Sequence, residues 1–283
     1  MSVPGLGKTS FLENQRMYLT RNGYMEETFF TFSLSPIRDE NGVIAGLFHP
    51  VTETTVVMLS ERRTRSLREL AQNTSEARTL ESVFATTVQA LAGHPFDLPF
   101  VLLYQLDELA QKATLIDATG IHRGLAASPQ ELSLDGNNYR SWPLSEIVKC
   151  REVVQIDDLK VRFGEFPGGP YPEGVSTALA RSLMIPGSDM PLGVIIVGVS
   201  PRLPLNDAYR SHLEQVTVAA SVALGNALAY EQERKRAEAL AEIDRAKTQF
   251  FRAFCSGRSG FLGLGCKGQF CLYRCSFRSP LWC

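Results

Sequence analysis

The first residues with the types and spacing for chemistry are Gly5-Leu6-Gly7-Lys8-Thr9-Ser10, which have the ending of a phosphate-binding loop. In such a loop, backbone N–H groups surround the phosphates, the lysine neutralises them and the next hydroxyl holds magnesium. The full motif has its first glycine at position 2, where this chain has Ser2, and no preceding chain supplies the required strand. The pattern therefore favours no nucleotide site. An enzyme of this class with a truncated N-terminus remains an alternative.

Cysteines are the next candidate ligands. Cys266, Cys271, Cys275 and Cys283 could in principle offer four thiolates to zinc. They include no Cys-x-x-Cys pair and the residues around them show no pattern of a folded element, so we expect them to be incidental. Before residue 251 the chain holds only Cys150, which indicates a reducing compartment without a disulfide framework.

The four histidines, His49, His94, His122 and His212, are scattered without metal-ligand spacing. We expect them to be solvated or bonded to near neighbours. The sequence also has no paired carboxylates, nucleophile elbow or ordered triad, so it predicts no catalytic residue and no metal site. It names no cofactor and no cofactor-binding residue.

Length and composition place the chain among ordinary globular proteins. It has 283 residues, a net charge of −1, and 44% hydrophobic and 21% charged residues. The longest unbroken apolar run, Leu192–Val199, is far shorter than the ~20 residues that a membrane helix needs, so we expect a cytoplasmic protein without a membrane partner. All charges after Phe251 are basic, which leaves the preceding residues acidic and argues against a nucleic-acid partner.

The elements that would position these residues follow from hydrophobic periodicity. We expect helices from Leu59 to Asn73, from Leu80 to Leu91 and from Asn206 or Asp207 onward. A strand at Glu27–Pro36 precedes a turn at Asp39–Gly42 and a returning strand at Val43–Val57. Further strands are expected at 100–106, 113–118, 153–156, 182–186 and 192–199, and a loop at 163–174. After Phe251 the periodicity disappears.

Three groups of residues resemble the input region of bacterial sensor histidine kinases. Asn22-Gly23-Tyr24, Glu26–Ser33 and Ser35–Asp39 resemble the closing strands of a PAS domain. The second group resembles a GAF domain and comprises Arg78–Glu81, Leu98–Phe100, Leu103-Tyr104, Pro191–Val194 and Gly198–Arg202. The third group resembles the signalling helix that leads to the phosphoacceptor domain and comprises Tyr230-Glu231, Arg236–Thr248 and Phe250-Phe251.

The resemblance implies an α+β fold, in which a GAF domain with a central antiparallel sheet and flanking helices follows the C-terminal strands of a PAS domain. The expected parts are an incomplete PAS domain at 1–58, a linker helix at 59–76, the GAF domain at 77–230, a coiled-coil helix at 231–251 and an unstructured Cys-, Arg- and Gly-rich tail at 252–283. The apolar positions Leu240, Ile243 and Phe250 of the charged helix favour a homodimer.

The resemblance stops after Phe251, because Ser256 stands where the family has its phosphoacceptor histidine and no histidine follows His212. We therefore interpret the chain as a non-enzymatic signal-input fragment of a two-component phosphorelay that lacks the ATP-binding domain. Two alternatives remain: an active histidine kinase whose C-terminal sequence is misassigned or frameshifted, and a free-standing GAF dimer that regulates a partner in trans.

Ligand signatures known in GAF domains are missing. The Asn-Lys, Phe and Asp-Glu pattern of cyclic-nucleotide binding is absent, and Cys150 lacks the adjacent histidine of a tetrapyrrole attachment site, so we expect it to be a packing cysteine. An unknown small molecule in the GAF pocket remains a candidate partner.

Overall fold

The computed structural model describes residues 8–258 apart from positions 108, 110, 135–139, 151 and 186, with the backbone alone described for 253–258. The predictions for residues 1–7 and for the four zinc-candidate cysteines, Cys266 to Cys283, lie outside this part of the chain. The chain divides into two compact units, Met1–Glu231 and Gln232–Cys283. Within the described residues, none of the helices combines the length and the apolar character needed to cross a membrane.

The N-terminal element is an antiparallel sheet whose longest strands are β1 (Ser10–Arg21) and β2 (Tyr24–Arg38). They are joined by Asn22 and Gly23, which both have positive φ, at 57° and 84°. Asn-Gly at this position forms the two-residue turn whose twist matches the flanking strands. The periodicity analysis misses β1, although Asn22-Gly23 is a strong local signal for a hairpin.

The returning strand is shorter than predicted. The turn at Asp39–Gly42 is present, with Gly42 at φ 79°, but the chain then forms two short strands, β3 (Ile44–Phe48) and β4 (Val51–Glu53). Both pair with β2. Pro50 lies between them and has no N–H to donate, which explains the interruption.

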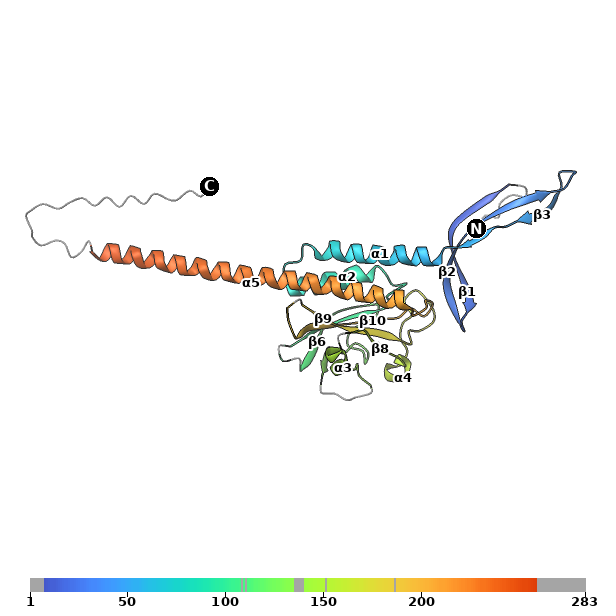
Figure 1. Cartoon of the computed structure of the whole chain (residues 1–283). Helices are drawn as coiled ribbons and strands as arrows, with labels where there is room; N and C mark the ends of the chain where they lie inside the picture. The colour runs from blue at the N-terminus through green and yellow to red at the C-terminus, as the bar shows by residue number, and fades with distance from the viewer. Residues whose placement is uncertain are drawn as a thin grey trace, which may run out of the picture. The chain divides into compact units, whose positions relative to one another are not determined.

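Two helices follow this sheet (Figure 1). The helix α1 spans Thr55–Thr74 and so begins before the predicted start at Leu59. The helix α2 spans Leu80–Ala92, close to the prediction. Its start is fixed by a capping box in which the Thr79 side chain accepts from the Ser82 N–H and the Ser82 side chain accepts from the Thr79 N–H.

The second sheet has six antiparallel strands in the order β7-β6-β5-β10-β9-β8. Their bounds are β5 (Val101–Leu106), β6 (Lys112–Thr119), β7 (Glu131–Ser133), β8 (Val154–Ile156), β9 (Ala178–Met184) and β10 (Pro191–Gly198). Four of the six strands match predicted strands closely, β9 overlaps the predicted strand at 182–186 only over residues 182–184, and β7 was not predicted. The short helices α3 (Leu144–Lys149) and α4 (Leu159–Phe163) were not predicted either. The predicted α+β class with a central antiparallel sheet is confirmed.

Each face of this sheet carries its own core, because alternate side chains of a strand point to opposite faces. On β5, Val101 and Leu103 pack with α1, α2 and α5, whereas Leu102 and Tyr104 pack with α3 and α4. Figure 1 shows the helices arranged as layers on either side of the sheet. The sheet is therefore covered on both faces and reads as continuous apolar runs in the sequence.

The α3 side is filled by aromatic rings. Phe100 stacks on Phe166 with ring centroids 5.2 Å apart, and Trp142 lies 4.7 Å from Phe163. The indole Nε1 of Trp142 donates to the carbonyl of Ala127 at 2.7 Å. Because the polar atom of the buried indole is satisfied, the cluster forms a stable interior on this face.

The last described element is one long helix, α5 (Asp207–Arg258). As expected, Asn206 caps it, since its side-chain Oδ1 accepts from the Tyr209 N–H at 3.0 Å. The apolar stripe of α5 is buried and consists of Leu213, Val216, Ala220, Ala223 and Ala227. Helical backbone continues to Arg258, beyond the predicted loss of regular structure after Phe251.

Candidate functional site

The strongest concentration of buried charge lies where the N-terminal sheet meets α1. The Glu27 side chain, on β2, is fully buried. Arg16 Nε lies 3.1 Å from its Oε1, while Arg62 donates from Nη1 and Nη2 at 3.1 and 3.0 Å. The Glu27 backbone N–H donates to the carbonyl of Arg202 at 2.8 Å. Through its carboxylate and its backbone N–H, Glu27 thereby links β1, β2, α1 and the loop after β10.

A second buried carboxylate, Asp97, lies between α2 and β5. It accepts from Arg62 Nε at 2.5 Å and from Arg63 Nε at 3.3 Å. Its backbone carbonyl accepts from the hydroxyl of Tyr209, at the start of α5. Arg62 therefore bridges Glu27 and Asp97, and its planar fork of donors suits two carboxylates better than a lysine would.

Aromatic rings shield this charge network from solvent. The Arg16 guanidinium lies 4.2 Å from the Phe96 ring centroid, a cation–π distance. Arg202 lies 4.6 Å from the rings of Tyr18 and Tyr171 and binds both carboxylate oxygens of Glu173 at 2.8 and 2.9 Å. These contacts join the N-terminal sheet to the loops of the larger sheet.

Two histidines tie α1 to its neighbours. His94 Nε2 lies 2.8 Å from Glu69 Oε2, and His212 Nε2 lies 2.8 Å from Ser66 Oγ. The Ser66 hydroxyl donates its proton to the carbonyl of Arg63 at 2.7 Å. With that proton engaged, Ser66 accepts from His212, an arrangement that places the histidine proton on Nε2 and a lone pair on Nδ1.

Burial and neighbouring charges shift the pKa values of His212 and Arg62 in this site. Burial, with smaller contributions from Arg63, His94 and Arg62, lowers the pKa of His212 to about 4 against the opposing effect of Asp97. At neutral pH His212 is therefore uncharged. Burial opposes the charged form of Arg62, but the carboxylates of Asp97 and Glu27 raise its pKa above the ordinary value.

The residues singled out in the sequence are dispersed. His49 and His122 are exposed, as expected of solvated histidines, whereas His94 and His212 are buried and hydrogen-bonded. Cys150 is a half-buried free thiol that packs against the α3-side core, so the expectation of a packing cysteine is met. In the N-terminal motif, Ser10 opens the strand β1 rather than the helix that a phosphate-binding loop requires.

Sequence reasoning missed Glu27, Arg62 and Asp97. One signal was available for Glu27, because it is two residues from Phe29 on a strand and so shares its face. The structure buries both side chains. Arg62 resembles an ordinary charged residue on the solvated face of a helix, and Asp97 lies in a loop. Nothing in the sequence near either residue therefore predicts that they pair.

The network joins β2 to α1 through paired charges. Among the described residues there is no cluster of three His, Cys, Asp or Glu side chains that could hold a metal ion. The buried carboxylates are both paired with arginines and present no free base. Displacing β2 from α1 would separate Glu27 from Arg62 and leave Arg16 as its cation, which is energetically costly.

Comparisons with known proteins give structural likenesses alone. No family model and no curated protein matches the chain. The GAF domain of an Acinetobacter phosphoenolpyruvate-protein phosphotransferase is 21% identical, covers 59% of this chain and 95% of its own, and has a TM-score of 0.43. The photosensory core module of Stigmatella aurantiaca phytochrome is 16% identical over 81% of this chain and 48% of its own, with a TM-score of 0.44.

A third likeness is to an enzyme. The free methionine-R-sulfoxide reductase of Neisseria meningitidis is 14% identical over 61% of this chain and 91% of its own, with a TM-score of 0.42. At these identities and TM-scores the three likenesses carry no functional argument.

Neutralising Glu27 should loosen the N-terminal sheet. We expect Glu27→Gln to weaken the protection of β1 and β2 amides by about 2 kcal/mol, because charge-assisted bonds to Arg16 and Arg62 become neutral ones. Hydrogen–deuterium exchange of peptides from residues 10–38 measures this. Glu13→Gln, at an exposed position of β1, is the matched control. Equal exchange in the two variants would contradict the anchoring role of Glu27.

Acid should destabilise the protein through His212. Its pKa is about 4 when folded and near 6.5 when unfolded, so the unfolded state binds the proton first and stability falls as the pH drops below 6.5. Between pH 7 and pH 5, we expect wild type to lose about 2 kcal/mol more unfolding free energy than His212→Gln. Urea titrations at both pH values measure the difference. His122→Gln, the same change at an exposed site, should keep the wild-type pH dependence.

Proposed function

We propose that this chain is the cytoplasmic signal-input region of a two-component sensor histidine kinase, with residues 77–230 as a sensory GAF domain. The motifs at Arg78–Glu81, Pro191–Val194 and Gly198–Arg202 support this assignment. A six-stranded antiparallel sheet between two helical layers is compatible with it. In this proposal the domain receives a signal and passes it to a transmitter through helices α1 and α5.

The proposal assigns β1 to β4 as the closing strands of an incomplete PAS domain. Consecutive antiparallel pairing of β1, β2 and β3 is compatible with that assignment. Arg62 then has a specific role, since it couples the PAS strands to the start of α1 through Glu27 and to the GAF sheet through Asp97. A shift of the N-terminal sheet would reach α1 without any ligand in between.

The observation that carries the proposal is the exposure of apolar residues on α5. Leu240, Ile243 and Phe250 are 67%, 64% and 67% exposed. Their spacing of three and seven residues places them on one side of the helix, where two copies would bury them in a coiled coil. We propose that this seam forms a homodimer and that its geometry transmits the signal.

The proposed fragment catalyses no phosphoryl transfer by itself. Ser256 lies within α5 at the position where the resembled kinases have their phosphoacceptor histidine. A serine hydroxyl would need a positioned base to act as a nucleophile. The transmitter domains would have to be supplied by a longer chain or by a partner.

A ligand on the α3 side of the sheet would have to displace packed side chains. Trp142 and Phe100 are buried there, and Trp142 has its indole N–H bonded. In this proposal, signal recognition on that face therefore requires rearrangement of the aromatic cluster.

Charges placed in the seam should dissociate the dimer. We expect Leu240→Glu with Ile243→Glu to raise the dimer dissociation constant by at least tenfold, because four like charges would meet in a buried interface. Analytical ultracentrifugation measures the constant. Ala241→Glu with Thr248→Glu adds the same charge on another side of the exposed helix and should leave it unchanged. Identical sedimentation of both double variants would remove the coiled coil from the proposal.

The transmitting role can be tested by changing the helical phase. Residues 1–251 are fused to the phosphoacceptor and ATP-binding domains of a sensor kinase that lacks its own input. Two residues inserted after Arg236 rotate the following helix by about 200°, whereas seven add about two full turns and preserve the phase. We expect the autophosphorylation rate to change with the first insertion and to return with the second. Indifference to both insertions would show that the helix does not couple input to output.

A further inference from the structure

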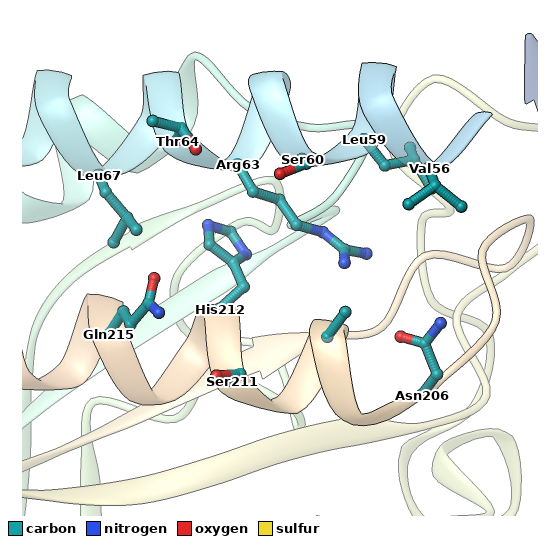
Figure 2. A pocket seen from close by; sticks show the side chains of 11 residues that line it. Val56, Leu59, Ser60, Arg63, Thr64, Leu67, Asn206, Ser211, His212 and Gln215 are labelled. Atoms are coloured by element: carbon teal, nitrogen blue, oxygen red, sulfur yellow. The ribbon is translucent and has the colours of Figure 1, made fainter. Parts of the chain in front are cut away.

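A cavity opens between α1 and the beginning of α5, on the helix side of the large sheet. Its volume is about 390 Å³. Figure 2 shows that α1 lines it with three apolar residues, Val56, Leu59 and Leu67, beside polar ones, and that Arg63 and His212 project toward the space between the helices. A cavity with an apolar wall and a few convergent polar groups is the usual form of a small-molecule site.

Arg63 places a guanidinium group with unpaired hydrogen-bond donors at this cavity. The residue is 8% exposed, and its Nε donates to Asp97 at 3.3 Å. Its two terminal amino groups have no hydrogen-bond partner among the described residues. Arg16, Arg62 and Arg63 share two carboxylates, Glu27 and Asp97, so the network carries one more positive than negative charge and favours an anion.

His212 brings an unpaired acceptor from the opposite helix. It is 3% exposed, its Nε2–H is used by Ser66, and its Nδ1 is buried without a hydrogen-bond partner. Leaving such an atom unpaired costs free energy. A neutral hydrogen-bond donor on a bound molecule would satisfy it.

We infer that this cavity binds a small 2-hydroxy acid with an apolar side chain. The carboxylate lies against the terminal amino groups of Arg63, the 2-hydroxyl donates to Nδ1 of His212, and the apolar chain packs on Val56, Leu59 and Leu67. A 2-amino acid fits less well, because its ammonium group would add positive charge beside Arg63 and Arg62. The inference does not rest on the proposed signalling function, although a ligand placed here would contact both helices that leave the domain.

Four probes that share one carbon skeleton test the chemistry by isothermal titration calorimetry on the full chain. They are 2-hydroxy-4-methylpentanoate, 4-methylpentanoate, leucine and 4-methylpentane-1,2-diol. We expect the hydroxy acid to bind most tightly. Loss of the hydroxyl donor, addition of the ammonium or loss of the carboxylate should each weaken binding by about tenfold or more. Equal affinity for all four probes, or no binding of the hydroxy acid, would overturn the inference.

Variants then locate the site. Arg63→Gln removes the anion partner and should weaken hydroxy-acid binding by about ten- to a hundredfold. Arg65→Gln makes the same change at an exposed position of α1 and should leave the affinity unchanged. Ala208→Phe fills the cavity from an exposed position, so it should abolish binding even if Arg63→Gln fails to fold.

Nuclear magnetic resonance separates binding of the hydroxy acid in the cavity from self-association of the chain through the same surface. The ¹⁵N resonance of His212 Nδ1 should move toward the hydrogen-bonded range on addition of the hydroxy acid and stay in place with 4-methylpentanoate. Wild-type affinity in Ala208→Phe would overturn the inference. So would sedimentation data in which the cavity variants change self-association and leave hydroxy-acid binding intact, because a second copy of the chain would then be the occupant.

Discussion

The bridge from Arg62 to two buried carboxylates is the constraint on which the arrangement of the first unit depends. Glu27 belongs to the N-terminal sheet, Asp97 to the entrance of the large sheet, and Arg62 to the helix between them. A buried carboxylate without a cation is unstable, so Arg62, with Arg16 at Glu27 and Arg63 at Asp97, is needed to keep both carboxylates buried. The N-terminal strands are held by charge as much as by apolar burial, since Phe29 is their one large apolar side chain in the buried core.

The two faces of the large sheet have different physical characters. The α3 side is closed by aromatic rings with satisfied polar atoms. The α1 and α5 side combines an apolar core with paired charges, a neutral buried histidine and a cavity. Rearrangement is easier where polar groups can exchange partners than where rings interlock. Under the proposed function, this difference favours the helix side as the place where a signal is received and passed on.

Hydrophobic periodicity predicted most of the described elements because their cores impose a period on the sequence. The helices at Leu80 and Asp207 and the strands of the large sheet show this directly. It failed at β1, where both faces are largely solvent-exposed and no alternation is required. It also overextended the returning strand, because apolar residues continue across Pro50 into the first turn of α1.

By itself, the sequence determined most strands of the large sheet and the long charged helix with its apolar seam, since each leaves a local pattern. The α+β class and the sheet with flanking helices were implied by the family resemblance. Tertiary structure alone decided the functional geometry. Arg62 and Glu27 are 35 positions apart, as are Arg62 and Asp97, and Ser66 and His212 are 146 apart. Pairing at such separations depends on how elements pack and leaves no periodic trace. A histidine that looks ordinary in the sequence becomes a neutral buried acceptor only because two distant helices enclose it.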